Sequence, residues 1–218
     1  YRKDYEKALK NFQYVKRFFI KDPSRYLAEL WIAKIYIEEN RLTDAMNVLD
    51  QLQTIAIDQK KEKFIDRIFK KKEAASPDEE MNPPMPENIQ FEIYKARADL
   101  YIRKSNADEA LFPLTQAIKK CKSKREKARL NYILGQLYQS KNRIDSSLIS
   151  FKSAITPSAN YDVSFNAKLN CAVLGSSARD VRMLNKMLKD EKNASYKDQI
   201  YYAKGRLEEQ NTNTVMAK

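Results

Sequence analysis

The chain has 218 residues and no His, and its 41 Lys and Arg exceed its 29 Asp and Glu, which gives a net charge of +12. The lack of His removes the commonest general base and metal ligand, and three Gly cannot supply a phosphate-binding loop. Two Cys are too few for a Cys-only zinc site or a disulfide framework. We therefore expect no enzyme, with no catalytic, cofactor-binding or metal-binding residues, and favour packed helices with a binding or scaffolding role.

The first pattern along the chain is a helical hairpin that recurs at constant spacing. In each copy a small residue of the first helix precedes one of the second by the same interval: Ala33 to Ala45, Ala98 to Ala110, and Gly135 to Ser147. Polar turns fall between them, at Asn40, at Ser105–Asn106 and at Asn142. Small residues let two antiparallel helices approach closely, and hairpins stack because one alone cannot bury its apolar face.

The clearest copy resembles the tetratricopeptide repeat (TPR). It contains Leu134-Gly135-x-x-Tyr138, followed by Phe151, Ala154 and Pro157. The resemblance covers nearly the whole chain except about residues 56–88, and it departs from the family pattern at Arg97, where Leu is usual. It implies an all-α, right-handed TPR superhelix (α-solenoid) of about ten helices in antiparallel hairpins, with one irregular Pro-rich insert.

We expect a single array over residues 1–218, with repeat-like units at about 1–23, 24–56, 89–122, 124–158, 160–191 and 194–218. The first unit supplies only a second helix, and the segment 161–188 is degenerate with an ambiguous register. Gly205 and Ala217 repeat the small-residue interval near the C-terminus. Both ends fall inside a repeat, so we expect a fragment whose open ends can self-associate.

The insert at 57–88 has two parts. Asp58 to Ala74 is typical of a basic amphipathic helix, and we expect its apolar stripe to pack on the array: Phe64, Ile65, Ile68 and Phe69. Ala75 to Asn88 is rich in Pro and acidic residues and is expected to be an exposed loop. This loop either docks a partner, covers the array's own surface or is disordered, and the sequence leaves these alternatives open.

The first helices of the hairpins are expected to line a groove that binds an extended peptide or a partner helix. The predicted groove residues are Leu27, Leu30, Lys34, Ile37, Lys95, Asp99, Ile102, Arg129, Tyr132, Gln136, Gln139, Tyr202 and Arg206. Trp31 is expected in the core or in the groove wall. A clamp for a C-terminal carboxylate is not expected, because Asp99 and Ile133 occupy the positions where polar ligands would stand.

A longer run resembles a narrower group. Met187-Leu188-x-Asp190-x-Lys192-Asn193-x-x-Tyr196-x-Asp198-Gln199-Ile200-Tyr201-Tyr202-Ala203 is similar to a phrase in the large TPR lipoproteins of the Bacteroidetes type IX secretion and gliding-motility apparatus, of the PorW/SprE type. This resemblance implies a non-catalytic scaffold in the periplasm that binds other secretion-machinery proteins. It would be attached to the outer membrane by a lipid anchor outside this fragment.

The basic residues suggest an alternative function. Lys and Arg gather in the insert helix and between residues 119 and 129, which is compatible with a basic helical-repeat protein that binds RNA or another polyanion. We do not expect nucleic acid as the ligand, because these residues sit at an insert and a turn and form no periodic column along the groove. Cys121 and Cys171 are expected to be free thiols, since their helices lie too far apart for a disulfide.

Overall fold

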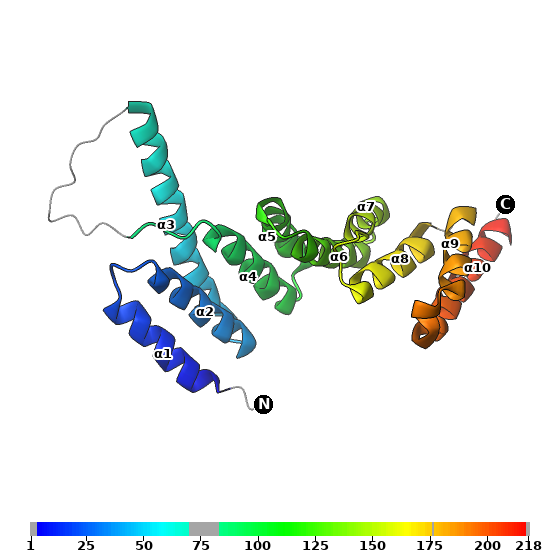
Figure 1. The fold of residues 1–218 in the computed structure, drawn as a ribbon, viewed down its shortest axis with the longest axis horizontal. Helices are drawn as coiled ribbons and strands as arrows, with labels where there is room; N and C mark the ends of the chain where they lie inside the picture. Colours follow the sequence, from blue (N-terminus) through cyan, green and yellow to red (C-terminus); the bar gives the residue numbers. More distant parts are fainter. Residues whose placement is uncertain (1–3, 70–82, 176, 217–218) are drawn as a thin grey trace. The chain divides into compact units, whose positions relative to one another are not determined.

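The computed structural model describes residues 4–69, 83–175 and 177–216. Within these ranges it has ten α-helices, one 3-10 helix and no strand. The elements, drawn in Figure 1, are α1 (Tyr5–Phe18), α2 (Ser24–Glu38), α3 (Leu42–Phe69), α4 (Ile89–Arg103), α5 (Ala107–Lys120), α6 (Lys124–Ser140), α7 (Ile144–Ala154), α8 (Tyr161–Gly175), α9 (Ala178–Lys189), η1 (Glu191–Tyr196) and α10 (Lys197–Met216). The prediction of an all-α helical-repeat fold of about ten helices is confirmed.

The chain divides into two compact units, residues 1–120 (unit 1) and 121–218 (unit 2). Unit 1 contains the hairpins α2–α3 and α4–α5, preceded by α1, and unit 2 contains α6–α7 and α8–α9, followed by α10. Three hairpins fall within the predicted units 89–122, 124–158 and 160–191. That all these helices belong to one continuous array stays a prediction.

The turns of three hairpins share one backbone geometry. Asn40, Ser105 and Asn142 have positive φ angles of 59°, 56° and 55°. In each turn the next N–H donates to the carbonyl of a Tyr in the last turn of the first helix: Arg41 to Tyr36 at 2.8 Å, Asn106 to Tyr101 at 2.9 Å, and Arg143 to Tyr138 at 2.9 Å. Such helix ends need a left-handed residue, for which Gly and Asn are best suited. The predicted turn positions are confirmed.

The small residues lie where the paired helices touch. Ala33, Ala45, Ala98 and Ala110 are all buried. In the α6–α7 hairpin, the buried Ser147 hydroxyl donates to the carbonyl of Gly135 at 2.9 Å, and a Cβ added at Gly135 would lie 2.6 Å from Cδ1 of Phe151. The recurring small-residue interval therefore marks helix contacts, as predicted.

Unit 1 has an apolar core between α2, α3 and α4. Its buried side chains are Tyr26, Leu30, Ala33, Ile37, Ala45, Leu49, Leu52, Ile89, Ile93, Ala96 and Leu100. On α2 and on α4 these residues are three or four positions apart, so each helix turns one stripe toward the core.

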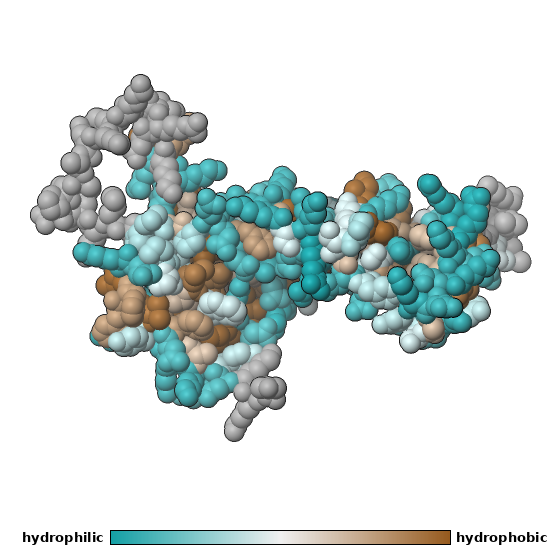
Figure 2. All heavy atoms as spheres, in the orientation of Figure 1, coloured by the Kyte–Doolittle hydropathy of each residue, from teal (hydrophilic) through white to brown (hydrophobic). Residues whose placement is uncertain are grey.

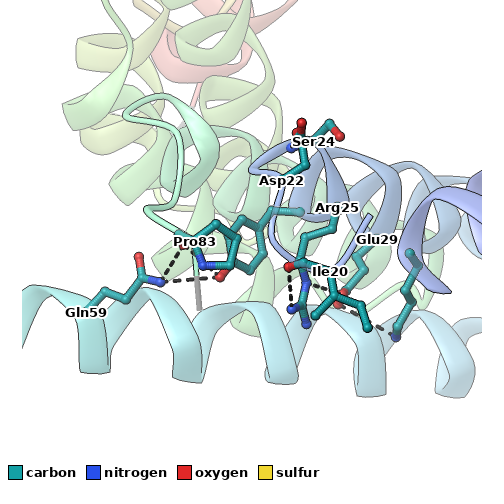
Figure 3. A network of polar contacts seen from close by, with 9 residues as sticks. Ile20, Asp22, Ser24, Arg25, Glu29, Gln59 and Pro83 are labelled. Carbon is teal, nitrogen blue, oxygen red and sulfur yellow. Dashed lines mark hydrogen bonds and ion pairs between the residues drawn. The ribbon is translucent and has the colours of Figure 1, made fainter. Parts of the chain in front are cut away.

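A buried carboxylate joins α1 to α2. Glu29 on α2 is buried, and one of its oxygens lies 3.7 Å from Lys16 Nζ on α1, while the other lies 3.7 Å from Arg25 Nε (Figure 3). The Arg25 guanidinium also donates to the Ile20 carbonyl at 3.2 Å. Because a buried charge is costly without partners, the Lys16 contact favours the docking of α1, while Arg25 partners the carboxylate from within α2.

The third helix is longer than predicted. α3 has 28 residues, so the expected separate helix from Asp58 is its second half. Phe64 and Ile65 are 63% and 52% exposed, and the prediction that they pack on the array is wrong. The end of α3 extends past the other helices of unit 1 (Figure 1), which leaves these residues without packing partners in the described part of the chain. The side chains of Ile68 and Phe69 are not among the described ones.

The insert returns to unit 1 at Pro83. Residues 70–82, which hold most of the predicted loop, lie outside the described ranges. The hydroxyl of buried Tyr26 and the side-chain amide of Gln59 both donate to the Pro83 carbonyl, at 3.0 and 2.9 Å (Figure 3). The Met85 N–H donates to Oε1 of Gln59 at 2.9 Å, and the Met85 side chain packs on the core of unit 1. Residues 83–85 therefore cover the unit's own surface, which was one of the alternatives left open.

In unit 2, the degenerate segment 161–188 forms the hairpin α8–α9. After it the chain turns through η1, where the Asp190 side chain accepts from the Lys192 N–H at 3.1 Å and the buried Asn193 amide donates to the Met187 carbonyl at 2.7 Å. α10 then continues through Gly205, so the interval that starts at Gly205 does not mark a hairpin. Ala217 lies outside the described residues.

Candidate functional site

The first helices of unit 1, α2 and α4, pack against each other, and each directs one stripe away from the core. Successive members are three or four residues apart and so share a helix face. We call these two stripes, with Ile102 beside them, the first-helix surface: Leu27, Trp31, Lys34 and Glu38 on α2, and Glu92, Lys95, Asp99 and Arg103 on α4. Five of the predicted groove residues lie on it: Leu27, Lys34, Lys95, Asp99 and Ile102.

Ion pairs link the two helices across this surface. Lys34 Nζ lies 2.7 Å from a carboxylate oxygen of Glu92, whose other oxygen is 3.2 Å from Lys95 Nζ. Further along, Arg103 on α4 lies 2.6 Å from Glu38 on α2. The charged side chains therefore hold one another in place before any ligand binds. Because they are already ordered, less side-chain conformational entropy is lost on binding.

Glu92 is the centre of the first of these pairings. Burial raises the pKa of its carboxyl, but the hydrogen bonds and charges of Lys34 and Lys95 outweigh burial, and the net pKa lies below its ordinary value. The carboxylate is therefore ionised at neutral pH, and the pairing with both lysines is present there.

An exposed aromatic stands in the middle of this surface. The side chain of Trp31 is 49% exposed, although Trp is usually well buried. Its ring stacks on Phe12 of α1, with centroids 6.1 Å apart and planes at 6°, and Lys34 Nζ lies 4.7 Å from its centroid. Hydrophobic residues gather over the part of unit 1 that α1 and α2 occupy (Figure 2). Trp31 is thus fixed by its neighbours while part of its ring stays open to solvent.

Two predicted groove residues belong elsewhere. Leu30 and Ile37 are only 2% and 1% exposed and lie in the core of unit 1, so the prediction that they line a groove is wrong. Each sits one position before a residue of the outward stripe, Trp31 or Glu38. Leu30 and Ile37 belong to the inward stripe of α2, whereas an i, i+4, i+7 count from Leu27 along the outward stripe leads to Trp31 and Lys34.

Unit 2 carries the remaining predicted groove residues. On α6, Arg129 and Gln136 are exposed, Gln139 is half-buried, and Tyr132 packs on Phe151 with ring centroids 5.5 Å apart. The Tyr132 hydroxyl accepts a hydrogen bond from the side-chain amide of Asn170 on α8 at 3.5 Å. Burial raises the pKa of Tyr132 more than this hydrogen bond lowers it, so the net pKa lies above its ordinary value. On α10, Tyr202 and Arg206 are exposed. That these residues and the first-helix surface form one groove stays a prediction.

Among the described residues no three His, Cys, Asp or Glu side chains gather in a way that could hold a metal. Over the same ranges, no helix has the length and apolarity to cross a bilayer. Both cysteines are free.

Comparison with known families bears on the α6–α7 hairpin. Residues 128–160 match the family model of the tetratricopeptide repeat, over a stretch that contains most of α6 and all of α7. No curated protein matches the chain. Repeats of this family generally mediate binding to other proteins, and proteins built from them are generally non-enzymatic scaffolds.

Proposed function

We propose that this chain is a non-enzymatic scaffold that binds another protein through the first-helix surface of unit 1. The observation that carries the proposal is Trp31, a half-exposed indole on α2 that stacks on Phe12 of α1 and contacts Lys34, whose ammonium is paired with Glu92 of α4. Fixed aromatic residues of this kind are the commonest energetic anchors of protein interfaces.

The surroundings of Trp31 suit a peptide or a helix of a partner. Leu27 and Ile102 add exposed apolar area, and the paired charges between them offer hydrogen-bonding groups to a partner's backbone or polar side chains. A narrow apolar strip bordered by fixed charges matches an extended segment or an amphipathic helix better than a small molecule.

The absence of enzymatic activity is part of the proposal and is supported by composition. The chain has no His for general base catalysis and no Gly-rich phosphate loop.

We further propose that the partner is a component of the type IX secretion and gliding machinery, and that the chain works in the periplasm as part of an outer-membrane lipoprotein. The support is the phrase from Met187 to Ala203. In the structure its residues build the corner between α9 and α10: Asp190 and Asn193 hold η1, while Ile200 and Ala203 are buried. Part of the phrase therefore has a structural role at this corner.

The test is capture of partners from the cell-envelope fraction of a gliding bacterium, with the tagged chain at physiological salt. Three baits are compared: the unaltered chain, Trp31→Ala, and Phe112→Ala, which removes an even more exposed aromatic from the second helix α5. We expect secretion or motility proteins on the first and third baits and their loss from the second. Equal capture by all three baits would reject the first-helix surface, and recovery of nucleic acid that is released by higher salt would favour the polyanion alternative.

A further inference from the structure

Unit 2 contains a pocket that the sequence did not indicate. It has a volume of about 280 Å³ and lies between α8, α9 and the start of η1. Its apolar wall is made of Phe165, Met183 and Met187, which belong to the core of this unit or pack against it. The volume is near the lower end for ligand sites and has room for about one or two amino-acid side chains.

The polar groups at the η1 end of the pocket are engaged within the chain. The Asp190 carboxylate accepts from the Lys192 N–H, and the Asn193 amide donates to the Met187 carbonyl. The Tyr161 hydroxyl donates to the Lys192 carbonyl at 3.0 Å. These groups are therefore occupied in holding the corner together.

The pocket is also lined by two lysine side chains. Lys168 of α8 and Lys186 of α9 both line it, and in the described part of the chain no carboxylate forms an ion pair with either ammonium. Asp190 also lines the cavity and carries one negative charge, so the two ammonium groups leave the cavity with a net positive charge that one further anion would balance. The cavity therefore combines two available cations with an apolar wall that includes two adaptable Met side chains.

We propose that this α8–α9 pocket binds an acidic side chain of a partner polypeptide together with the apolar side chain next to it. The carboxylate lies between Lys168 and Lys186, and the apolar side chain contacts Phe165, Met183 and Met187. The inference rests on the proposed function in that it takes the ligand to be a polypeptide, but the site is distinct from the first-helix surface of unit 1.

The probe is a fluorescein-labelled peptide, Gly-Ser-Glu-Leu-Ser-Gly, with both termini blocked, and binding to the whole chain is followed by fluorescence anisotropy. We expect Lys168→Gln and Lys186→Gln each to weaken binding about threefold to fivefold, the range for a partly exposed ion pair. Replacing Glu by Gln in the peptide has a similar effect, and replacing Leu by Ser weakens binding about tenfold.

Lys189→Gln is the matched control, because Lys189 lies on α9, is exposed and does not line the pocket. The Lys189→Gln variant is expected to bind the peptide as tightly as the unaltered chain does. Equal weakening by Lys189→Gln would overturn the proposal in favour of general attraction by the +12 charge. Binding of only those peptides with a free C-terminus would overturn it in favour of a terminal carboxylate. Trp31→Ala is expected to leave peptide binding unchanged, so this site and the first-helix surface can fail separately.

Discussion

Gly135→Ala tests the close helix packing on which the repeat depends. A methyl group at Gly135 would lie 2.6 Å from Cδ1 and 2.7 Å from Cε1 of Phe151. The Phe151 ring is fully buried, packs against the tilted ring of Tyr132, and belongs to a cluster with Ala167 and Cys171 of α8. The ring therefore cannot move without disturbing a second helix, and such overpacking costs about 1–3 kcal/mol.

The same substitution also changes helix propensity, which acts in the opposite direction. Ala in a helix interior is more favourable than Gly by about 1 kcal/mol. Gly205→Ala isolates this effect, because Gly205 lies within α10 and nothing stands within 4 Å of its added Cβ. We expect Gly205→Ala to stabilise unit 2 by about 1 kcal/mol. The difference between the two variants equals the overpacking cost, about 1–3 kcal/mol.

The assay is urea unfolding followed by far-UV circular dichroism, with fluorescence of Trp31, the single tryptophan, as a monitor of unit 1. Phe151→Leu in the Gly135→Ala background is expected to recover part of the loss. If Gly135→Ala stabilises the chain as much as Gly205→Ala does, the account of helix contact at Gly135 is wrong.

Four further predictions concern single sites. Ser105→Gly should stabilise unit 1 by about 1 kcal/mol in urea unfolding, because Ser105 has φ 56°, whereas Ser153→Gly inside α7 should destabilise unit 2 by a similar amount. Burial raises the pKa of the Cys171 thiol to about 11, so at pH 8 an aromatic disulfide reagent should titrate only one thiol in the folded chain, and Cys121→Ser should abolish that reaction. Glu92→Gln should cost about 0.5–1 kcal/mol at pH 7. Since the folded pKa of Glu92 is lowered, this contribution is present above the unfolded value of about 4.3 and is lost as pH falls through the folded pKa, so the difference between variant and parent in urea unfolding should shrink as the pH is lowered below about 4.3. Finally, Gln59→Leu should speed amide exchange of Met85, measured by mass spectrometry, and an unchanged rate would show that the Gln59 contact does not hold the segment.

The hairpins could be predicted because their determinants are local. The small residues that meet in each hairpin and the left-handed turn residues at Asn40 and Asn142 are close in sequence. The length of α3 was also within reach, since no Gly, Pro or Asn interrupts the run from Leu49 to Phe69. The expected end of the repeat near residue 56 is what led to the prediction of two helices in this run.

The errors concern contacts between distant segments. Leu30 and Ile37 follow the same spacing as Leu27 and Lys34, and only the packing of α3 and α4 decides which stripe is buried. Phe64 and Ile65 form an apolar stripe that has no packing partner in the described structure, a fact that periodicity cannot show. The pocket at Lys168 and Lys186 depends on the register of α8 against α9, which was ambiguous in the sequence.

The most direct test of the central claim is the affinity of a captured partner for three purified forms of the chain, measured by calorimetry at two salt concentrations. We expect Trp31→Ala to weaken binding about thirtyfold or more, because an anchoring Trp contributes about 2 kcal/mol or more at an interface. Phe112→Ala should bind as the parent does, and salt should change all three affinities only modestly. Unchanged binding by Trp31→Ala, or an affinity that falls steeply with salt for every form, would contradict the account.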